Sequence, residues 1–215
     1  MKLAAKELRL SEPTEDDLKK IKRRPIYIIC DNVLDTYNIG SIFRLADAVA
    51  ASCVYLCAGS ETPPNSRIAK ASVGTDKWVK WEYFKTAEES IRNLRKKFST
   101  LRDNSGQARS NSKISDVVAS EAKQSNREKI ATGSSSPCNE KGGVRIVAIE
   151  QGKGSVDFRE ADYRLPIAFI VGHETDGVSK EALALCDEIL EIPMFGVNRS
   201  LNVMVSLAIV LFRAI

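Results

Sequence analysis

Six short segments with strand character recur along the chain, and most are separated by segments whose apolar residues repeat at helical spacing. Continuous apolar runs rich in Val and Ile are typical of strands buried on both faces of a parallel sheet. Strands that alternate with helices predict an α/β fold, in which a mostly parallel sheet carries helices on both faces. The expected strands are Ile26–Cys30, Cys53–Cys57, Lys77–Phe84, Val144–Ile149, Ile167–Val171 and Glu188–Ile192.

Changes in composition divide the chain into an extension, a main domain and an insertion. Residues 1–24 are highly charged, and we expect a helical N-terminal extension there, with Thr14 capping a helix over Glu15–Arg23. Residues 25–215 form the main domain. Its expected helices follow the first strand from about Ile39 to Ala50 and then cover Thr86–Phe98, Lys180–Leu185 and Leu201–Phe212.

Residues 99–143 interrupt this domain. They contain ten serines and no aromatic residue, so they cannot bury enough apolar surface to offset the entropy of ordering, and we expect a disordered insertion. The string VVASEAKQSN resembles translated bacterial repeat elements, which favours a passenger segment. An RNA-binding loop is the alternative, and it would use the basic residues Arg102, Arg109, Lys113, Lys123, Arg127 and Lys129.

Composition excludes several classes of protein. The five cysteines form no CxxC pair and lie mostly in apolar runs, which indicates reduced thiols. The single histidine, His173, argues against a zinc site and against Ser/His or Cys/His hydrolases. No apolar run approaches the ~20 residues of a membrane span, and the charged N-terminus does not resemble a signal peptide, so we expect a cytoplasmic protein. A net charge of +4 permits RNA binding without requiring it.

The first of three glycine-containing polar loops covers Asp31–Ala48. Ligands of open α/β sheets bind beyond the carboxyl ends of strands, so such loops are the expected site. Asn38 is a candidate helix N-cap, and we expect Arg44 near the same helix face, where the two could hold a phosphate or a sugar. Alternatively, Arg44 only forms an ion pair with Asp47 or Asp31.

The second and third loops follow the last two apolar strands. Phe169–Leu183 places Gly172, Glu174 and Gly177 in a tight loop that could receive a ligand on its backbone. In Glu191–Phe212, Ser200 and Asn202 lie at the head of an almost wholly apolar helix. For Ser200, capping of that helix is the alternative to ligand contact.

Taken in order, NIGSIFR, VGHETDGVS and IPMFGVNRSLNV resemble the three motifs of the SpoU (TrmH-like) family of RNA 2′-O-ribose methyltransferases, and the resemblance covers Pro25–Phe98 and Val144–Phe212. It implies a C-terminal trefoil knot of the SPOUT type, S-adenosylmethionine (SAM) as cofactor, tRNA or rRNA as substrate, a homodimer, and no metal or membrane partner. A catalytically impaired RNA-binding protein with the same fold is the alternative. A dinucleotide-binding dehydrogenase is disfavoured because no GxGxxG follows the first strand.

The resemblance also implies roles for individual residues. The catalytic group consists of Arg44, Asn38, Glu174, Ser200 and Asn202, and the residues that would enclose SAM are Val171, Gly172, Gly177, Ile192, Met194 and Leu201. The chain departs from the family pattern at Ala50, where glycine is common, at His173, where a small residue is common, and at Met204, where serine is common. Basic residues expected to face RNA are Arg9, Lys19–Lys22, Arg67, Lys70 and Lys77.

Overall fold

The computed structural model describes residues 2–107 and 143–215. The chain separates into two compact units, of which Met1–Leu94 with Val144–Ile215 contains the whole sheet and Arg95–Gly143 is the other. The prediction of a disordered or RNA-binding insertion falls largely on residues 108–142, outside the described residues. Helix α5 covers Ala87–Gln107 and so continues past Phe98, where the sequence pattern ended it.

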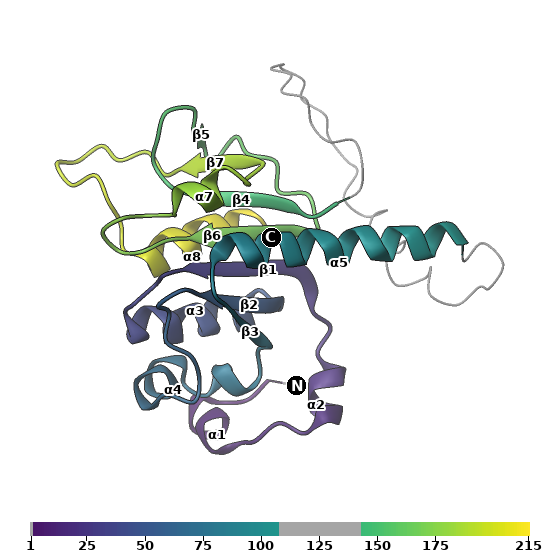
Figure 1. Ribbon diagram of the computed structural model, residues 1–215. Coiled ribbons are helices and arrows are strands. Elements are labelled where there is room, and N and C mark those ends of the chain that lie inside the picture. The colour runs from purple at the N-terminus through teal and green to yellow at the C-terminus, as the bar shows by residue number, and fades with distance from the viewer. Residues whose placement is uncertain (1, 108–142) are drawn as a thin grey trace. The chain divides into compact units, whose positions relative to one another are not determined.

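The sheet has seven strands in the order β3-β2-β1-β6-β4-β7-β5, and every pair of neighbours in it is parallel (Figure 1). This confirms the predicted α/β class. The expected third strand is half as long as predicted, because Thr75–Lys77 forms a short 3₁₀ helix, η1, ahead of it. The strands are β1 Arg24–Asp31, β2 Ala51–Cys57, β3 Trp81–Phe84, β4 Arg145–Ile149, β5 Val156–Asp157, β6 Ile167–Val171 and β7 Glu188–Glu191.

The N-terminal extension contains two short helices where one was expected. Thr14 caps the second of them as predicted, since its side chain accepts a hydrogen bond of 3.2 Å from the Asp17 N–H. The other helices agree with the sequence pattern to within a few residues, apart from the longer α5 and from α4, which was not expected. The helices besides α5 are α1 Ala5–Leu10, α2 Glu15–Lys20, α3 Thr36–Ala48, α4 Ser66–Ser72, α7 Lys180–Leu183 and α8 Val203–Arg213.

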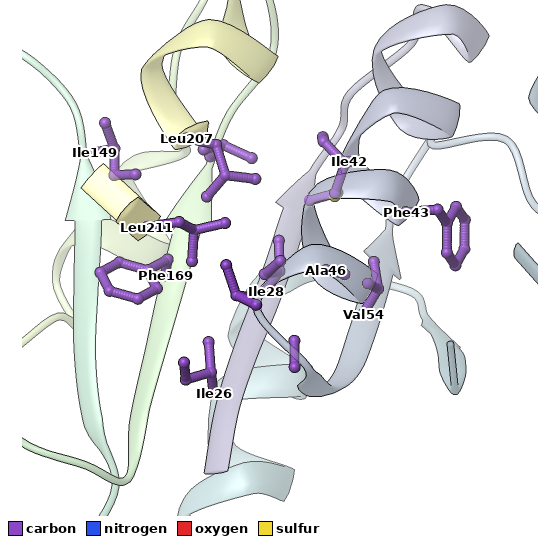
Figure 2. Close-up of a cluster of buried hydrophobic side chains, with 14 of the residues drawn as sticks. Ile26, Ile28, Ile42, Phe43, Ala46, Val54, Ile149, Phe169, Leu207 and Leu211 are labelled. Atoms are coloured by element: carbon purple, nitrogen blue, oxygen red, sulfur yellow. The ribbon is translucent and has the colours of Figure 1, made fainter. Parts of the chain in front are cut away.

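Helices α3 and α8 cover one face of the sheet. Successive strand residues point to opposite faces, so Ile26 and Ile28 of β1 pack in the same cluster as Ile42 of α3 and Leu207 of α8 (Figure 2). Residues on the other side of β1 are also buried, as expected for a sheet covered on both faces. On that side, Ser90 of α5 lies against Cys57 of β2.

The strand order reverses between β1 and β6. From β1 the chain proceeds to β2 and β3 in one direction, and the later strands lie on the opposite side of β1. Loops leave the carboxyl ends of strands in opposite directions at such a switch point, which opens a crevice for ligands. The loops after β1 and β6 are therefore the expected place for a ligand-binding site. The knot stays a prediction.

No helix among the described residues is long and apolar enough to cross a membrane.

Ala50 connects α3 to β2 in the left-handed backbone region, with φ of 52°. A Cβ is unfavourable there, so Ala50→Gly is expected to raise the free energy of unfolding by about 0.5–1 kcal/mol. Ala48→Gly is the matched control, because Ala48 is helical and glycine there should destabilise by a similar amount. Urea unfolding of both variants measures the difference, and a destabilised Ala50→Gly protein would contradict this account.

Candidate active site

The loop between β6 and α7 closes on two glycines. The backbone of His173 exchanges hydrogen bonds of 3.0 and 2.9 Å with the backbone of Gly177. A Cβ added to Gly172 would lie 2.1 Å from the carbonyl carbon of Gly177, and Gly177 itself has φ of +71°. Both positions therefore require glycine. The closed loop carries Glu174 between its two ends.

Glu174 of this loop reaches the loop that follows β1. Its carboxylate accepts hydrogen bonds from the Asn38 Nδ2 at 3.0 Å, the Asp35 N–H at 3.2 Å and the Leu34 N–H at 3.4 Å. Burial by itself would raise the pKa of Glu174, but hydrogen bonds from the Asn38 amide and from backbone N–H groups outweigh it and lower the pKa below its ordinary value of 4.5. The carboxylate is thus held in its charged form.

Asn38 in turn joins this loop to the head of α8. Its Oδ1 accepts a hydrogen bond of 3.0 Å from Asn202 Nδ2. Asn202 is the N-cap of α8, and its own Oδ1 accepts from the Met204 N–H at 2.9 Å. Asn38 is only 6% exposed, and these two bonds satisfy both the nitrogen and the oxygen of its buried amide. One hydrogen-bonded chain, Asn202–Asn38–Glu174, therefore links all three predicted loops.

A cavity of about 460 Å³ opens beyond the carboxyl ends of β4, β6 and β7, next to this chain. All six residues expected to enclose a cofactor line it: Val171, Gly172, Gly177, Ile192, Met194 and Leu201. Glu174, Ser200 and Asn202 line it as well. Its size lies within the usual range for small-molecule sites, about 300–1,000 Å³. Polar side chains, among them Glu150, Asn198 and Arg199, line it alongside the apolar ones.

Two carboxylates that the sequence analysis did not assign to the site bind the C-terminal end of this loop. Glu150, which directly follows β4 and lines the cavity, accepts a hydrogen bond of 3.0 Å from the Val178 N–H. Asp31, at the end of β1, accepts one of 2.8 Å from the Ser179 N–H. Glu150 could have been found by the rule used for the other loops, because it is the first polar residue after an apolar strand.

Ser200 lies at the cavity but outside the hydrogen-bonded chain. Its N–H and Oγ donate to Asn198 Oδ1 at 3.1 and 3.4 Å. The alternative reading of Ser200 as the cap of the last helix is wrong, because Asn202 fills that position. Asn38 is likewise not an N-cap: Asp35 caps α3 by accepting from the Tyr37 N–H at 2.8 Å.

Arg44 is not brought to the cavity of its own chain. It lies exposed on α3, where a separation of six residues turns it about 120° away from buried Asn38, so the expected common helix face is wrong. The alternative ion pairs are also wrong, since Asp47 lies 3.5 Å from Arg23 and Asp31 is bonded to Ser179. Arg44 forms no hydrogen bond or ion pair with any described residue.

The described residues include no group of three or more His, Cys, Asp or Glu side chains that could hold a metal ion.

The pH dependence of stability should report the hydrogen bonds of Glu174. Because folding lowers its pKa, this carboxylate contributes stability above about pH 4.5, and the contribution is lost as the pH falls through the lowered value. Glu174→Gln should therefore destabilise the protein at pH 7, and its difference from the unsubstituted protein should shrink as the pH falls below 4.5. Urea unfolding at several pH values measures this. A difference that is constant with pH would contradict it.

One protein family matches the parts of the chain that contain these three loops. The model of the SpoU rRNA methylase family matches residues 25–131 and 108–212. The tRNA (guanosine(18)-2′-O)-methyltransferase of Escherichia coli (strain K12) is 29% identical over 197 residues, which are 90% of this chain and 64% of that protein. The chain thus spans slightly less than two thirds of the length of that relative.

Solved structures agree with the fold. The TrmH/SpoU tRNA modifying enzyme of A. aeolicus superimposes with a TM-score of 0.64 at 25% identity, over 98% of this chain and 80% of that one. The SpoU methyltransferase AviRb of Streptomyces viridochromogenes, solved in complex with AdoMet, has a TM-score of 0.61 at 22% identity, over 94% of this chain and 63% of that one. Since the family model matches most of the chain, the protein belongs to the SpoU rRNA methylase family.

Proposed function

We propose that this protein transfers a methyl group from SAM to a ribose 2′-OH of tRNA or rRNA in the cytoplasm. The observation that carries the proposal is the hydrogen-bonded chain Asn202–Asn38–Glu174 beside the cavity. Three segments far apart in sequence meet there, and each contains one of the family-like motifs. Membership of the SpoU family and the names of the relatives support the reaction class.

The cavity fits SAM in size and in the chemistry of its lining. Val171, Ile192, Met194 and Leu201 offer apolar surface for an adenine ring and a methylene chain. Gly172 and Gly177 of the closed loop add backbone atoms to the cavity wall, with no side chain at either position. When bound, SAM supplies an activated methyl group on a sulfonium with a good leaving group. The chain then has to orient the ribose oxygen and assist the loss of its proton.

In this proposal the residues divide into two kinds of role. Asn38, Glu174 and Asn202 are positioning residues that hold the three loops together, and Ser200 is a contact on the cavity wall. Arg44 acts on the ribose. A guanidinium stays protonated at ordinary pH, so Arg44 stabilises negative charge that develops on the 2′-oxygen, and the proton leaves to water or an RNA oxygen.

A homodimer would place Arg44 where it is needed. Arg44 is absent from the cavity of its own chain, so a second copy has to supply it. Helix α8 offers a surface for that copy, because apolar residues on its outer side stay exposed while Leu207 and Leu211 are buried. The exposed residues are Val205 and Phe212 of α8, together with Leu201 before the helix and Ile215 after it. Analytical ultracentrifugation tests this, and a monomer at micromolar concentration would contradict it.

The RNA surface of the proposal differs from the one expected from sequence. Lys19 and Lys20 form ion pairs with acidic residues of α2, and Lys77 pairs with Glu12, so they are less suited to bind phosphate. Arg67 and Lys70 of α4 are exposed and form no ion pair with a described residue. Helix α4 touches α3, which carries Arg44: a Cβ on Gly40 of α3 would meet the Ala71 Cβ at 2.5 Å.

A double variant tests this surface. Arg67→Glu with Lys70→Glu should weaken RNA binding by about 10-fold or more. The salt dependence of binding should also fall, because a protein that contacts fewer phosphates releases fewer counterions when it binds. The matched control is Lys19→Glu with Lys20→Glu on α2. Filter binding at several salt concentrations measures both. Equal effects of the two double variants would contradict the placement of RNA over α3 and α4.

Two measurements test the function as a whole. Isothermal titration calorimetry should detect SAM binding to the purified protein, and labelled methyl from SAM should appear in tRNA or rRNA at a ribose 2′-O. Protein that binds RNA but neither binds SAM nor transfers a methyl group would instead be the catalytically impaired RNA-binding protein. Mapping 2′-O-methyl positions in RNA from cells that lack the gene would identify the nucleotide.

A further inference from the structure

The two ring nitrogens of His173 have different surroundings. Nδ1 accepts hydrogen bonds from the backbone N–H groups of Thr175 at 3.1 Å and Asp176 at 3.2 Å. These bonds lie inside the closed loop that carries Glu174. His173 thus orders this loop with its own side chain, in addition to the backbone bonds that it exchanges with Gly177.

This geometry assigns the proton of the ring. A nitrogen that accepts two N–H donors carries no hydrogen, so the neutral imidazole must carry its hydrogen on Nε2. The Asp176 carboxylate lies 3.4 Å from Nδ1, and an ion pair there would need a proton on that nitrogen. Both backbone donors already point at Nδ1, so Nδ1 is the acceptor and Nε2 carries the hydrogen.

Nε2–H of His173 is an accessible donor. Nε2 forms no hydrogen bond with a described residue. It is also not among the described side-chain atoms that are both buried and unpaired, so it is accessible. The His173 side chain is 19% exposed, and the residue lines the cavity beside Glu174 and Gly172. The charged residues Glu150, Glu174 and Arg199 line the same cavity. A ligand atom that meets this N–H has to be an acceptor.

We propose that His173 binds the methyl donor through Nε2–H, by donating to an oxygen of SAM, while Nδ1 holds the loop that positions Glu174. The inference rests on the proposed function, because it takes SAM as the occupant of the cavity. The acceptor is a hydroxyl of the ribose or the carboxylate of the methionine part. His173 is then a cofactor-binding residue and a positioning residue at once.

Two substitutions separate the two roles. In His173→Asn, the amide oxygen can take the place of Nδ1 as acceptor for the loop, but no atom replaces Nε2–H. In His173→Ala, both functions are lost. We expect the midpoint of thermal unfolding without SAM to stay close to that of the unsubstituted protein in His173→Asn and to fall in His173→Ala.

Calorimetric titration with SAM tests the binding role. His173→Asn should bind SAM about 5- to 10-fold more weakly than the unsubstituted protein, the effect of one lost hydrogen bond. Titration with 5′-methylthioadenosine, which lacks the carboxylate, locates the acceptor: an equal loss indicates a ribose hydroxyl, and no loss indicates the carboxylate.

Three results would overturn the inference. If His173→Asn binds SAM as tightly as the unsubstituted protein, Nε2–H makes no contact with the cofactor. If His173→Asn unfolds as early as His173→Ala, Nδ1 is not the group that orders the loop. If the unsubstituted protein itself fails to bind SAM, the proposed function is wrong and the binding role of His173 is lost with it, whereas the comparison of thermal unfolding still decides the loop role.

Discussion

Replacing Gly172 with alanine should weaken SAM binding about 100-fold. The added Cβ would lie 2.1 Å from the carbonyl carbon of Gly177 and 2.3 Å from the Val178 nitrogen, and these are backbone atoms that cannot rotate away. The loop must therefore open, which displaces Glu174 and one wall of the cavity. A 100-fold loss of affinity is about 2.8 kcal/mol, which corresponds to two or three lost hydrogen bonds. We also expect a loss of about 1–3 kcal/mol in the free energy of unfolding from overpacking.

Gly152→Ala is the matched control for this substitution. A Cβ on Gly152 has no neighbour within 4 Å, and its φ is not in the left-handed region. The control should bind SAM and unfold like the unsubstituted protein. Calorimetry and urea unfolding measure both properties. Normal SAM affinity in Gly172→Ala would show that the closed loop is not part of the cofactor site.

Replacing Arg44 with alanine should slow methyl transfer about 100- to 1,000-fold, the usual effect of removing one group that stabilises developing charge in a transition state. The affinity for SAM should change by no more than about two-fold, because Arg44 does not line the SAM cavity of its own chain. Single-turnover transfer of labelled methyl measures the rate. Arg24→Ala is a control for charge alone, since Arg24 lies at the opposite end of β1 from the site.

Mixing two inactive variants tests whether Arg44 acts across a dimer. One subunit carries Arg44→Ala and keeps its cavity; the other carries Gly172→Ala and keeps its arginine. In a mixed dimer, the intact cavity of the first subunit meets the intact Arg44 of the second, so part of the activity should return. If Arg44 serves its own chain, the mixture stays inactive. Unchanged methylation by Arg44→Ala alone would refute its role altogether.

Much of the site could be predicted because it follows from the strand pattern. Polar loops after β1 and β6 had to meet at one edge of a parallel sheet, and Asn38 and Glu174 do so. Periodicity also located β6 at its observed bounds. Glu150 was missed although the same rule applies to it and two glycines, Gly152 and Gly154, follow it, because it lies outside the three motifs that carry the family resemblance.

Other features were beyond local patterns. The N-caps shifted from Asn38 to Asp35 and from Ser200 to Asn202, because the start of a helix depends on which neighbouring polar side chain finds better partners in the folded protein. The hydrogen bond between Asn38 and Asn202 spans 164 positions of sequence, and no periodicity reports it. Arg44 shows a further limit: its expected place beside Asn38 rested on sequence separation, and helix α3 turns the two residues about 120° apart.

The position of β1 in the sheet has a consequence for synthesis on the ribosome. One edge of β1 pairs with β2, which follows directly, but the other edge pairs with β6, which begins only at Ile167. Until that segment emerges, β1 presents a free row of N–H and C=O groups on an apolar strand, the arrangement most prone to pairing with another nascent chain. Every residue between β2 and β6 lengthens the time for which β1 lacks its second partner strand. Translation speed and chaperone access, rather than the stability of the folded protein, should therefore govern the yield of native protein.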